Sequence, residues 1–179
     1  KEGENHPSTV MAVEEIVHTA KTALNLGISH LKLTGGEPLL RKDILDIVEG
    51  IAELRGLRNL SMTTNVTFLE AMAKDLKMKG LNRVNISLPT LNPETYRNLM
   101  GGNLKDAIEG VRAAVEANLY PVKLNMLILK NVNEGEVEKM IQFAEQTTTI
   151  LQLIELEPLN LNKSYYERHH LDLEGIEQR

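Results

Sequence analysis

The chain of 179 residues suits one ordinary domain, and its 42% apolar and 25% charged residues exclude wholesale disorder. The net charge of −5, with no long basic run, argues against a surface dedicated to nucleic acid or to anionic membranes. No apolar stretch approaches the ~20 residues of a membrane helix, which favours a cytoplasmic location, and the lack of cysteine excludes disulfides and thiolate ligands within this chain.

Helical and strand patterns alternate along the chain, separated by glycine and proline. Asn92 followed by Pro93 predicts a helix start, and Asn133 with Glu136 resembles a capping box. The expected helices begin near Pro7, Asp43, Phe68, Pro93, Leu104 and Asn133, and a short helix is expected in the arm after Leu161. The expected strands are His30–Thr34, Asn59–Thr63, Arg83–Leu88, Val122–Leu129 and Ile150–Leu156.

This alternation predicts βαβ units and a parallel sheet. Alternate residues of a strand face opposite sides, and one set of positions in the five strands is apolar throughout. The other set is polar, as with Ser61, Asn85 and Gln152. A doubly wound sheet buries both faces and a closed barrel has an apolar interior, so neither matches. A sheet with helices on one face, curved around a solvent-filled ligand cavity, matches this pattern. An open two-layer sheet whose polar face meets solvent is the alternative.

The segment Gly35-Gly36-Glu37-Pro38 follows the first expected strand. Two glycines at a strand end allow backbone groups to approach a ligand without an intervening Cβ, and Glu37 supplies a carboxylate for a cation. This pattern suits an ammonium group better than a phosphate, because the Lys-Ser/Thr of a phosphate loop is absent. Ligands of parallel α/β proteins bind at the carboxyl ends of strands, where this segment lies.

In its setting, LKLTGGEPLLRKD, this segment resembles the second strand of radical S-adenosylmethionine (SAM) enzymes. The stretches SMTTN, NRVNISL, TLNPETY, PVKLNMLILKNVNE and ILQLIELEPLN extend the similarity over residues 28–160. Together they are most similar to the archaeal form of the GTP 3′,8-cyclase (MoaA) family of molybdenum-cofactor biosynthesis. The resemblance implies an α/β partial TIM-like barrel with parallel strands and helices on its outer face.

The resemblance also implies roles for individual residues. SAM would be bound by Gly35, Gly36, Glu37, Ser87 and Asn125. GTP would be bound by Lys32, Thr63 and Lys123. In this family a 4Fe–4S cluster reduces SAM to methionine and a 5′-deoxyadenosyl radical, which takes hydrogen from C3′ of GTP before C3′ attacks C8. No residue of this chain is assigned a catalytic role or a metal ion.

The chain departs from the family pattern in several places. The cluster-binding motif CxxxCxxC is absent, and we expect it to lie before Lys1. Residues 1–160 are therefore interpreted as the partial-barrel core without its first strand, and 161–179 as an arm leading to a missing C-terminal region. As it stands, the fragment is expected to be inactive. His30, Pro89 and Gln152 also differ from bacterial members, which leaves the triphosphate contacts open.

Two other functions remain open at this point. Another radical SAM enzyme, acting on a peptide or tRNA, would keep the Gly-Gly-Glu segment but would need a different wall in place of Thr63 and Lys123. A non-catalytic α/β binding domain is the second. The unpaired edge at His30–Thr34 also predicts association, for example as a homodimer. His169-His170 suggests a metal only weakly, since adjacent histidines lack helical ligand spacing.

Overall fold

Five parallel strands form one sheet in the order β1-β2-β3-β4-β5 in the computed structural model, which describes residues 10–158 and 162–174. Each crossover moves one strand further in the same direction, as in a barrel, whereas a doubly wound sheet reverses direction. The predicted parallel partial barrel is confirmed. The strands are β1 His30–Leu33, β2 Asn59–Thr64, β3 Arg83–Ser87, β4 Lys123–Leu127 and β5 Ile150–Ile154.

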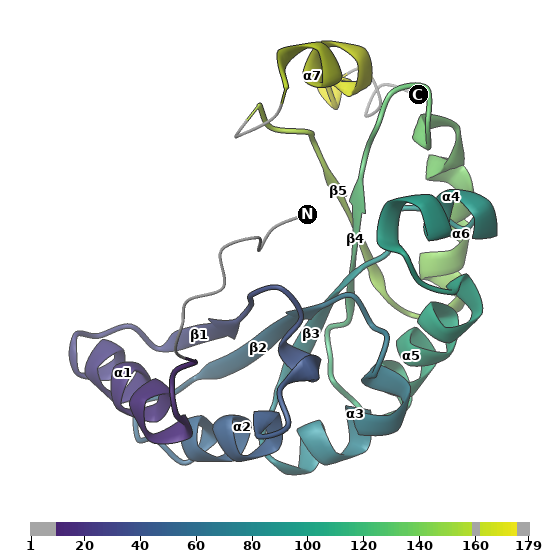
Figure 1. Ribbon diagram of the computed structural model, residues 1–179. Helices are drawn as coiled ribbons and strands as arrows, with labels where there is room; N and C mark the ends of the chain where they lie inside the picture. The colour runs from purple at the N-terminus through teal and green to yellow at the C-terminus, as the bar shows by residue number, and fades with distance from the viewer. Residues whose placement is uncertain (1–9, 159–161, 175–179) are drawn as a thin grey trace.

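The helices that connect the strands lie on the convex side of the curved sheet, and none of these helices covers its concave side (Figure 1). Asn92 caps α4 as expected, because its side chain accepts hydrogen bonds from the N–H groups of Glu94 and Thr95. The α-helices are α1 Val13–Asn25, α2 Ile44–Ala52, α3 Leu69–Met78, α4 Pro93–Met100, α5 Leu104–Glu116, α6 Val137–Gln146 and α7 Lys163–His169. Two 3₁₀ helices, η1 Pro38–Leu40 and η2 Glu134–Glu136, were not expected from the sequence.

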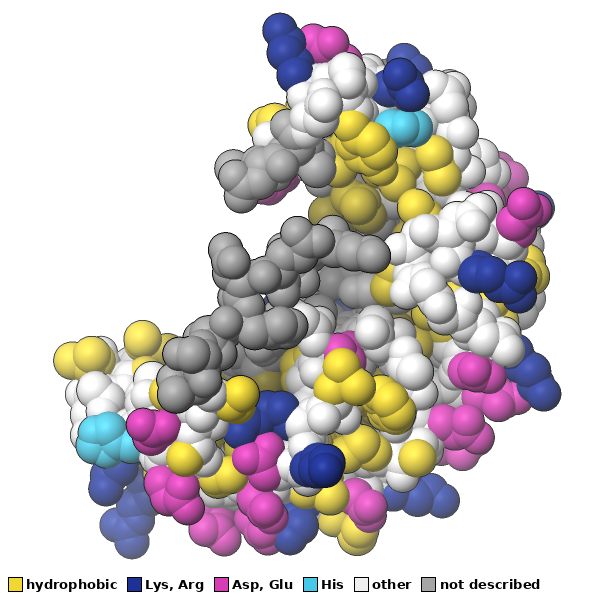
Figure 2. Space-filling model, in the orientation of Figure 1, with side chains coloured by type: hydrophobic (Ala, Val, Ile, Leu, Met, Phe, Trp, Pro, Cys, Tyr) yellow, Lys and Arg dark blue, Asp and Glu magenta, His cyan; other side chains and the backbone are white. Residues whose placement is uncertain are grey.

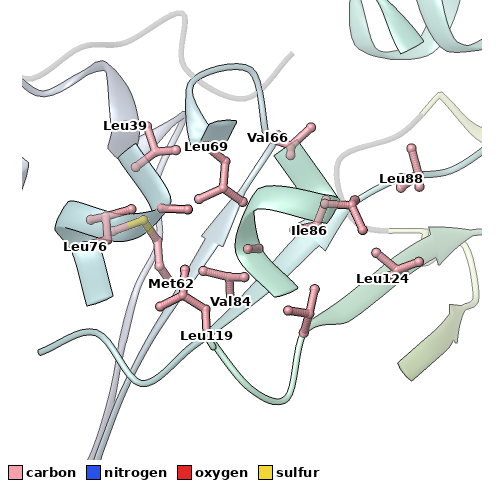
Figure 3. Packing of buried hydrophobic residues seen from close by; sticks show 14 of the residues in the cluster. Leu39, Met62, Val66, Leu69, Leu76, Val84, Ile86, Leu88, Leu119 and Leu124 are labelled. Atoms are coloured by element: carbon pink, nitrogen blue, oxygen red, sulfur yellow. The ribbon is translucent and has the colours of Figure 1, made fainter. Parts of the chain in front are cut away.

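The core lies between the sheet and these outer helices. Met62 of β2 and Val84 of β3 are fully buried, and Figure 3 shows them among Leu69 and Leu76 of α3 and Leu119. Each such side chain contributes roughly 1.5–3 kcal/mol when it is fully buried. The apolar face expected from alternation is therefore the convex, helix-covered face. Its polar counterpart is the concave face, and this geometry positions the site.

The two edges of the sheet and the chain ends complete the fold. Within residues 10–158 and 162–174, β1 pairs only with β2, so it is an edge strand as expected. Association through that edge stays a prediction. Pro7, where the first helix was expected to begin, lies outside the described residues. In the described part of the chain, no helix combines the length and apolarity needed to span a membrane.

Candidate functional site

A cavity of about 690 Å³ lies at the carboxyl ends of the five strands, on the concave side. This volume is within the range of sites that bind small molecules and cofactors. Figure 2 shows the hollow of the molecule on this side, with hydrophobic side chains gathered on its upper wall. The cavity is lined by Thr34, Gly35, Gly36, Thr63, Thr64, Asn65, Ser87, Pro89, Leu99, Met100, Asn125, Leu127, Leu129, Ile154, Leu156 and Tyr165.

The lining divides into a polar and an apolar half. The ends of β1, β2 and β3 supply the glycines and polar side chains, including Thr63 and Ser87. The ends of β4 and β5, with α4 and α7, supply mainly apolar groups such as Leu127, Ile154 and Tyr165. The concave face is thus less uniformly polar than alternation suggested, because Leu127 and Ile154 point inward. Such a lining suits a ligand with one hydrogen-bonding part and one flat or apolar part.

Gly35 and Gly36 are open toward this space. Apart from the adjoining residues in the chain, a Cβ atom placed on either glycine would meet no atom of the described residues within 4 Å, so neighbouring side chains there do not require glycine. Both residues line the cavity. A side chain there would fill the space in front of the backbone, and its absence leaves room for a ligand to contact the peptide groups directly.

Glu37 holds the ends of β1 and β2 together, an arrangement that we name the β1–β2 brace. Its Oε1 accepts hydrogen bonds from Thr64 Oγ1 at 2.7 Å and from Leu39 N at 3.1 Å, and its Oε2 accepts one from Asn65 N at 2.6 Å. Thr64 Oγ1 in turn accepts a bond from Val66 N at 3.0 Å. Val66 has a φ of 74°, which is uncommon for a β-branched residue, and the brace fixes that turn.

Asn133 and Glu136 form a second arrangement, which we name the β3–β4 brace. Asn133 Oδ1 accepts from Leu129 N at 2.7 Å, and its Nδ2 donates to Pro89 O at 2.7 Å and Leu127 O at 2.8 Å. All three partners line the cavity, so the amide of Asn133 fixes the ends of β3 and β4 relative to each other.

Glu136 completes the β3–β4 brace in the same way that Glu37 forms the first. Its Oε1 accepts from Thr90 Oγ1 at 2.7 Å, and its Oε2 accepts from Leu91 N at 2.9 Å. The capping box expected from Asn133 and Glu136 is therefore wrong, since neither side chain caps its own helix. Both bind loops more than 40 residues away in sequence, which local spacing cannot reveal.

Each of the expected lysines lies two residues before a cavity-lining residue, Lys32 before Thr34 and Lys123 before Asn125. Lys123 is half-buried and pairs in register with Asn85, which in turn pairs with Thr63. Lys32 is exposed and pairs with Ser61. Neither lysine lines the cavity, and neither has an ion pair within the described ranges. The structure therefore brings Gly35, Gly36, Thr63, Ser87 and Asn125 together, leaves both lysines outside the cavity lining, and engages Glu37 in a brace.

Sequence reasoning assigned no role to two residues of the site, Asn85 and Tyr165. The side-chain oxygens of Asn85 and Asn125 are buried, and neither has a hydrogen-bond partner among the described residues. Asn125 lines the cavity, and its unpartnered oxygen agrees with a ligand-binding position. Alternation placed Asn85 on the polar face, but it gave no sign that its amide is unpaired. Tyr165 reaches the cavity from α7, and no sequence motif indicated it.

The two adjacent histidines attach α7 to the strand ends. The backbone N–H of Lys130 donates a hydrogen bond to the carbonyl of His169 at 2.9 Å. Nδ1 of His169 lies 3.1 Å from the carbonyl oxygen of Lys130. His170 Nε2 contacts Glu155 Oε1 at 2.7 Å. The imidazoles thus have separate partners, and no group of three metal-ligating side chains occurs in residues 10–158 and 162–174.

The sequence matches the family model described as the radical SAM superfamily over residues 2–144. A "Probable GTP 3′,8-cyclase" of Archaeoglobus fulgidus is 42% identical over all of this chain, which covers 60% of that protein. Proteins with the same description from Saccharolobus islandicus and Thermococcus kodakarensis are 41% and 44% identical. They align with 99% and 93% of this chain, which covers 57% and 54% of their lengths. The chain thus spans little more than half of these relatives.

Solved structures are similar in fold at much lower identity. A radical SAM methyltransferase from Sphaerobacter thermophilus superposes with a TM-score of 0.70 at 18% identity, over 93% of this chain and 51% of that protein. Methylornithine synthase gives a TM-score of 0.65 at 21% identity, over 84% of this chain and 45% of that protein. These similarities support the partial-barrel fold and say nothing about the substrate.

Proposed function

The chain belongs to the radical SAM superfamily, and we propose that it forms the central part of a GTP 3′,8-cyclase, a lyase of molybdenum-cofactor biosynthesis. The observation that carries the proposal is the cavity at the strand ends, whose lining contains five of the residues that the resemblance assigns to ligands. The description of the archaeal relatives as probable GTP 3′,8-cyclases supports the same substrate.

SAM fits the polar half of the cavity. The open space in front of Gly35 and Gly36 suits a backbone contact with its amino group, and Ser87 and Asn125, which line the same cavity, would bind its aminocarboxylate and ribose. Asn125 supplies an amide oxygen that has no partner among the described residues. Glu37 would act by holding Thr64 and Asn65 in place through the brace.

When bound, SAM and a reduced 4Fe–4S cluster supply the one-electron chemistry that removes a hydrogen atom from the substrate. The chain contains no cysteine, so the thiolates that hold such a cluster do not come from its own residues. The part played by this chain is to bind the ligands, to orient them and to exclude water from the cavity. The apolar half of the cavity, including Leu127 and Ile154, lowers water access where a reactive carbon species forms.

GTP is proposed to bind between the cavity and the lysines. Lys32 and Lys123 are on the concave face without ion-pair partners in the described residues, and a triphosphate requires cations of this kind. Thr63 pairs with Asn85, which pairs with Lys123, and Thr63 also lines the cavity. It therefore lies between the lysine and the SAM end of the site.

The proposal is tested with the intact protein that carries this chain, reconstituted anaerobically with its cluster and reduced. Incubation with GTP and SAM is expected to yield equal amounts of 5′-deoxyadenosine and the cyclised nucleotide, detected by mass spectrometry. Formation of 5′-deoxyadenosine only when a peptide or tRNA is supplied would overturn the GTP assignment and favour another radical SAM reaction.

A further inference from the structure

Three side chains lie in one register row across the concave face, and we name them the central row. Thr63 of β2 pairs with Asn85 of β3, and Asn85 pairs with Lys123 of β4. Neighbouring strands are about 4.8 Å apart, so the three side chains lie beside one another on the same face. Asn85 occupies the middle of the row, between two residues that the proposed function assigns to the nucleotide.

Asn85 differs from its polar neighbours on the same face. It is 7% exposed, and its Oδ1 atom is buried without a hydrogen-bond partner among the described residues. Ser61 lies two residues before Thr63 on β2 and faces the same side of the sheet. It is 2% exposed, but its hydroxyl donates a hydrogen bond to Leu31 O at 3.2 Å. An unpaired buried acceptor lowers the stability of the folded state, so an Asn85 amide without a ligand is unfavourable where Ser61 is not.

The missing partner of Asn85 is a hydrogen-bond donor. Ionised phosphates contain acceptors only, whereas a nucleoside offers ribose hydroxyls and the N–H groups of its base. Rotation about χ2 of asparagine is soft, so the amide oxygen can turn toward a donor in the cavity. Thr63 and Ser87, the neighbours of Asn85 across and along the strand, both line that cavity.

We infer that Asn85 is a further substrate-binding residue, whose amide oxygen accepts a hydrogen bond from a hydroxyl or N–H group of the nucleoside part of the nucleotide. This inference rests on the proposed function and deepens it. It divides the central row into a nucleoside contact at Asn85 and a phosphate contact at Lys123.

The test compares Asn85→Leu with Ser61→Ala in the intact protein. Binding of GTP, guanosine and inorganic tripolyphosphate is measured by calorimetry, and the melting temperature is measured without ligand. For Asn85→Leu we expect affinity for GTP and guanosine to fall roughly 3- to 10-fold, the effect of one lost hydrogen bond. Affinity for tripolyphosphate should be unchanged, and the ligand-free melting temperature should stay equal or rise. Ser61→Ala should leave all three affinities unchanged.

The ligand-free measurement separates binding from a structural role. A lower melting temperature for both Asn85→Leu and Asn85→Ala would overturn the inference, because the amide would then stabilise the fold itself; the alanine variant decides the matter if leucine does not fit. Unchanged guanosine affinity in either variant would also overturn it, while GTP binding by the unaltered protein leaves the proposed function standing. Failure of the unaltered protein to bind GTP contradicts the proposed function, and the inference with it.

The donor is located with three analogues. Variant and unaltered protein are compared for binding of 2′-deoxy-GTP, 3′-deoxy-GTP and inosine triphosphate. The analogue for which Asn85→Leu no longer weakens binding lacks the donor, namely a ribose hydroxyl or the 2-amino group. If all three are weakened as much as GTP, the donor is N1–H of guanine.

Discussion

The β3–β4 brace and the central row each contain a buried asparagine, but the two amides are in opposite states. In the brace, Asn133 is 1% exposed and uses its oxygen and both protons of its nitrogen for bonds to three backbone groups. In the central row, Asn85 is 7% exposed and its oxygen has no partner within the described ranges. Neither residue is itself part of the cavity lining, but each adjoins residues that are, Thr63 and Ser87 for Asn85 and Pro89, Leu127 and Leu129 for Asn133.

This difference separates two tasks of buried polar groups. Strand ends that leave the sheet expose backbone groups, and the two braces satisfy them and fix the shape of the cavity wall. Within the sheet most backbone groups are paired by the neighbouring strands, so a side chain such as that of Asn85 has few backbone groups to satisfy. A polar group there remains available to a ligand, at some loss of stability without it.

The largest effect is expected in the β3–β4 brace. Asn133→Ala removes three hydrogen bonds and leaves buried backbone groups unpaired, so the free energy of unfolding should fall by about 2–4 kcal/mol. Urea denaturation followed by circular dichroism measures this change. Asn98→Ala, at an exposed position of α4, is the matched control and should have little effect. A loss for Asn133→Ala no greater than that of the control would contradict the role of the brace.

The two glutamates provide a matched pair. Glu37→Gln and Glu136→Gln each weaken charge-assisted hydrogen bonds, so each should lower the unfolding free energy by about 1–3 kcal/mol. The residues held by Glu37, Thr64 and Asn65, line the cavity, whereas Thr90 and Leu91 do not. Binding of S-adenosylhomocysteine, measured by calorimetry, should therefore weaken for Glu37→Gln and stay unchanged for Glu136→Gln. Equal affinities in the two variants would show that the β1–β2 brace does not shape the ligand site.

Substitution in the central row should change ligand affinity rather than stability, whereas substitution in the braces lowers stability. Lys123→Met removes a cation that has no ion-pair partner within residues 10–158 and 162–174, so we expect the stability to be nearly unchanged and the GTP affinity to fall roughly 10-fold. The loss should shrink as salt is added, because screening weakens the same attraction in the unaltered protein. Lys74→Met, on the exposed surface of α3, is the control. Calorimetric titrations at two salt concentrations decide whether Lys123 contributes.

The smallest effect provides a baseline for the others. Lys163 and Glu167 form an exposed pair on α7 with a separation of 3.7 Å. Exposed pairs contribute little, so Glu167→Gln should shift the melting temperature by less than about 2 °C. A larger shift in differential scanning calorimetry would mean that α7 is attached to the sheet through more than the contacts of His169 and His170.

Much of the fold was predictable, since hydrophobic periodicity is a local property. The bounds of the strand at Arg83–Leu88 and the start of the helix at Pro93 were expected within one residue of those observed. The cavity lining at Gly35, Gly36, Thr63, Ser87 and Asn125 was also anticipated. The roles of Asn133 and Glu136 were missed, because the same spacing serves a local cap and a long-range brace equally well.

The sequence by itself determined which residues face the helices and which face the concave side, since alternation along a strand requires only the order of side chains. It also determined the family, through stretches that keep their order along the chain. The tertiary structure alone decided which buried polar groups are paired. Pairing depends on distances between strand ends and loops far apart in sequence, and these distances are set only when the sheet curves and its helices pack.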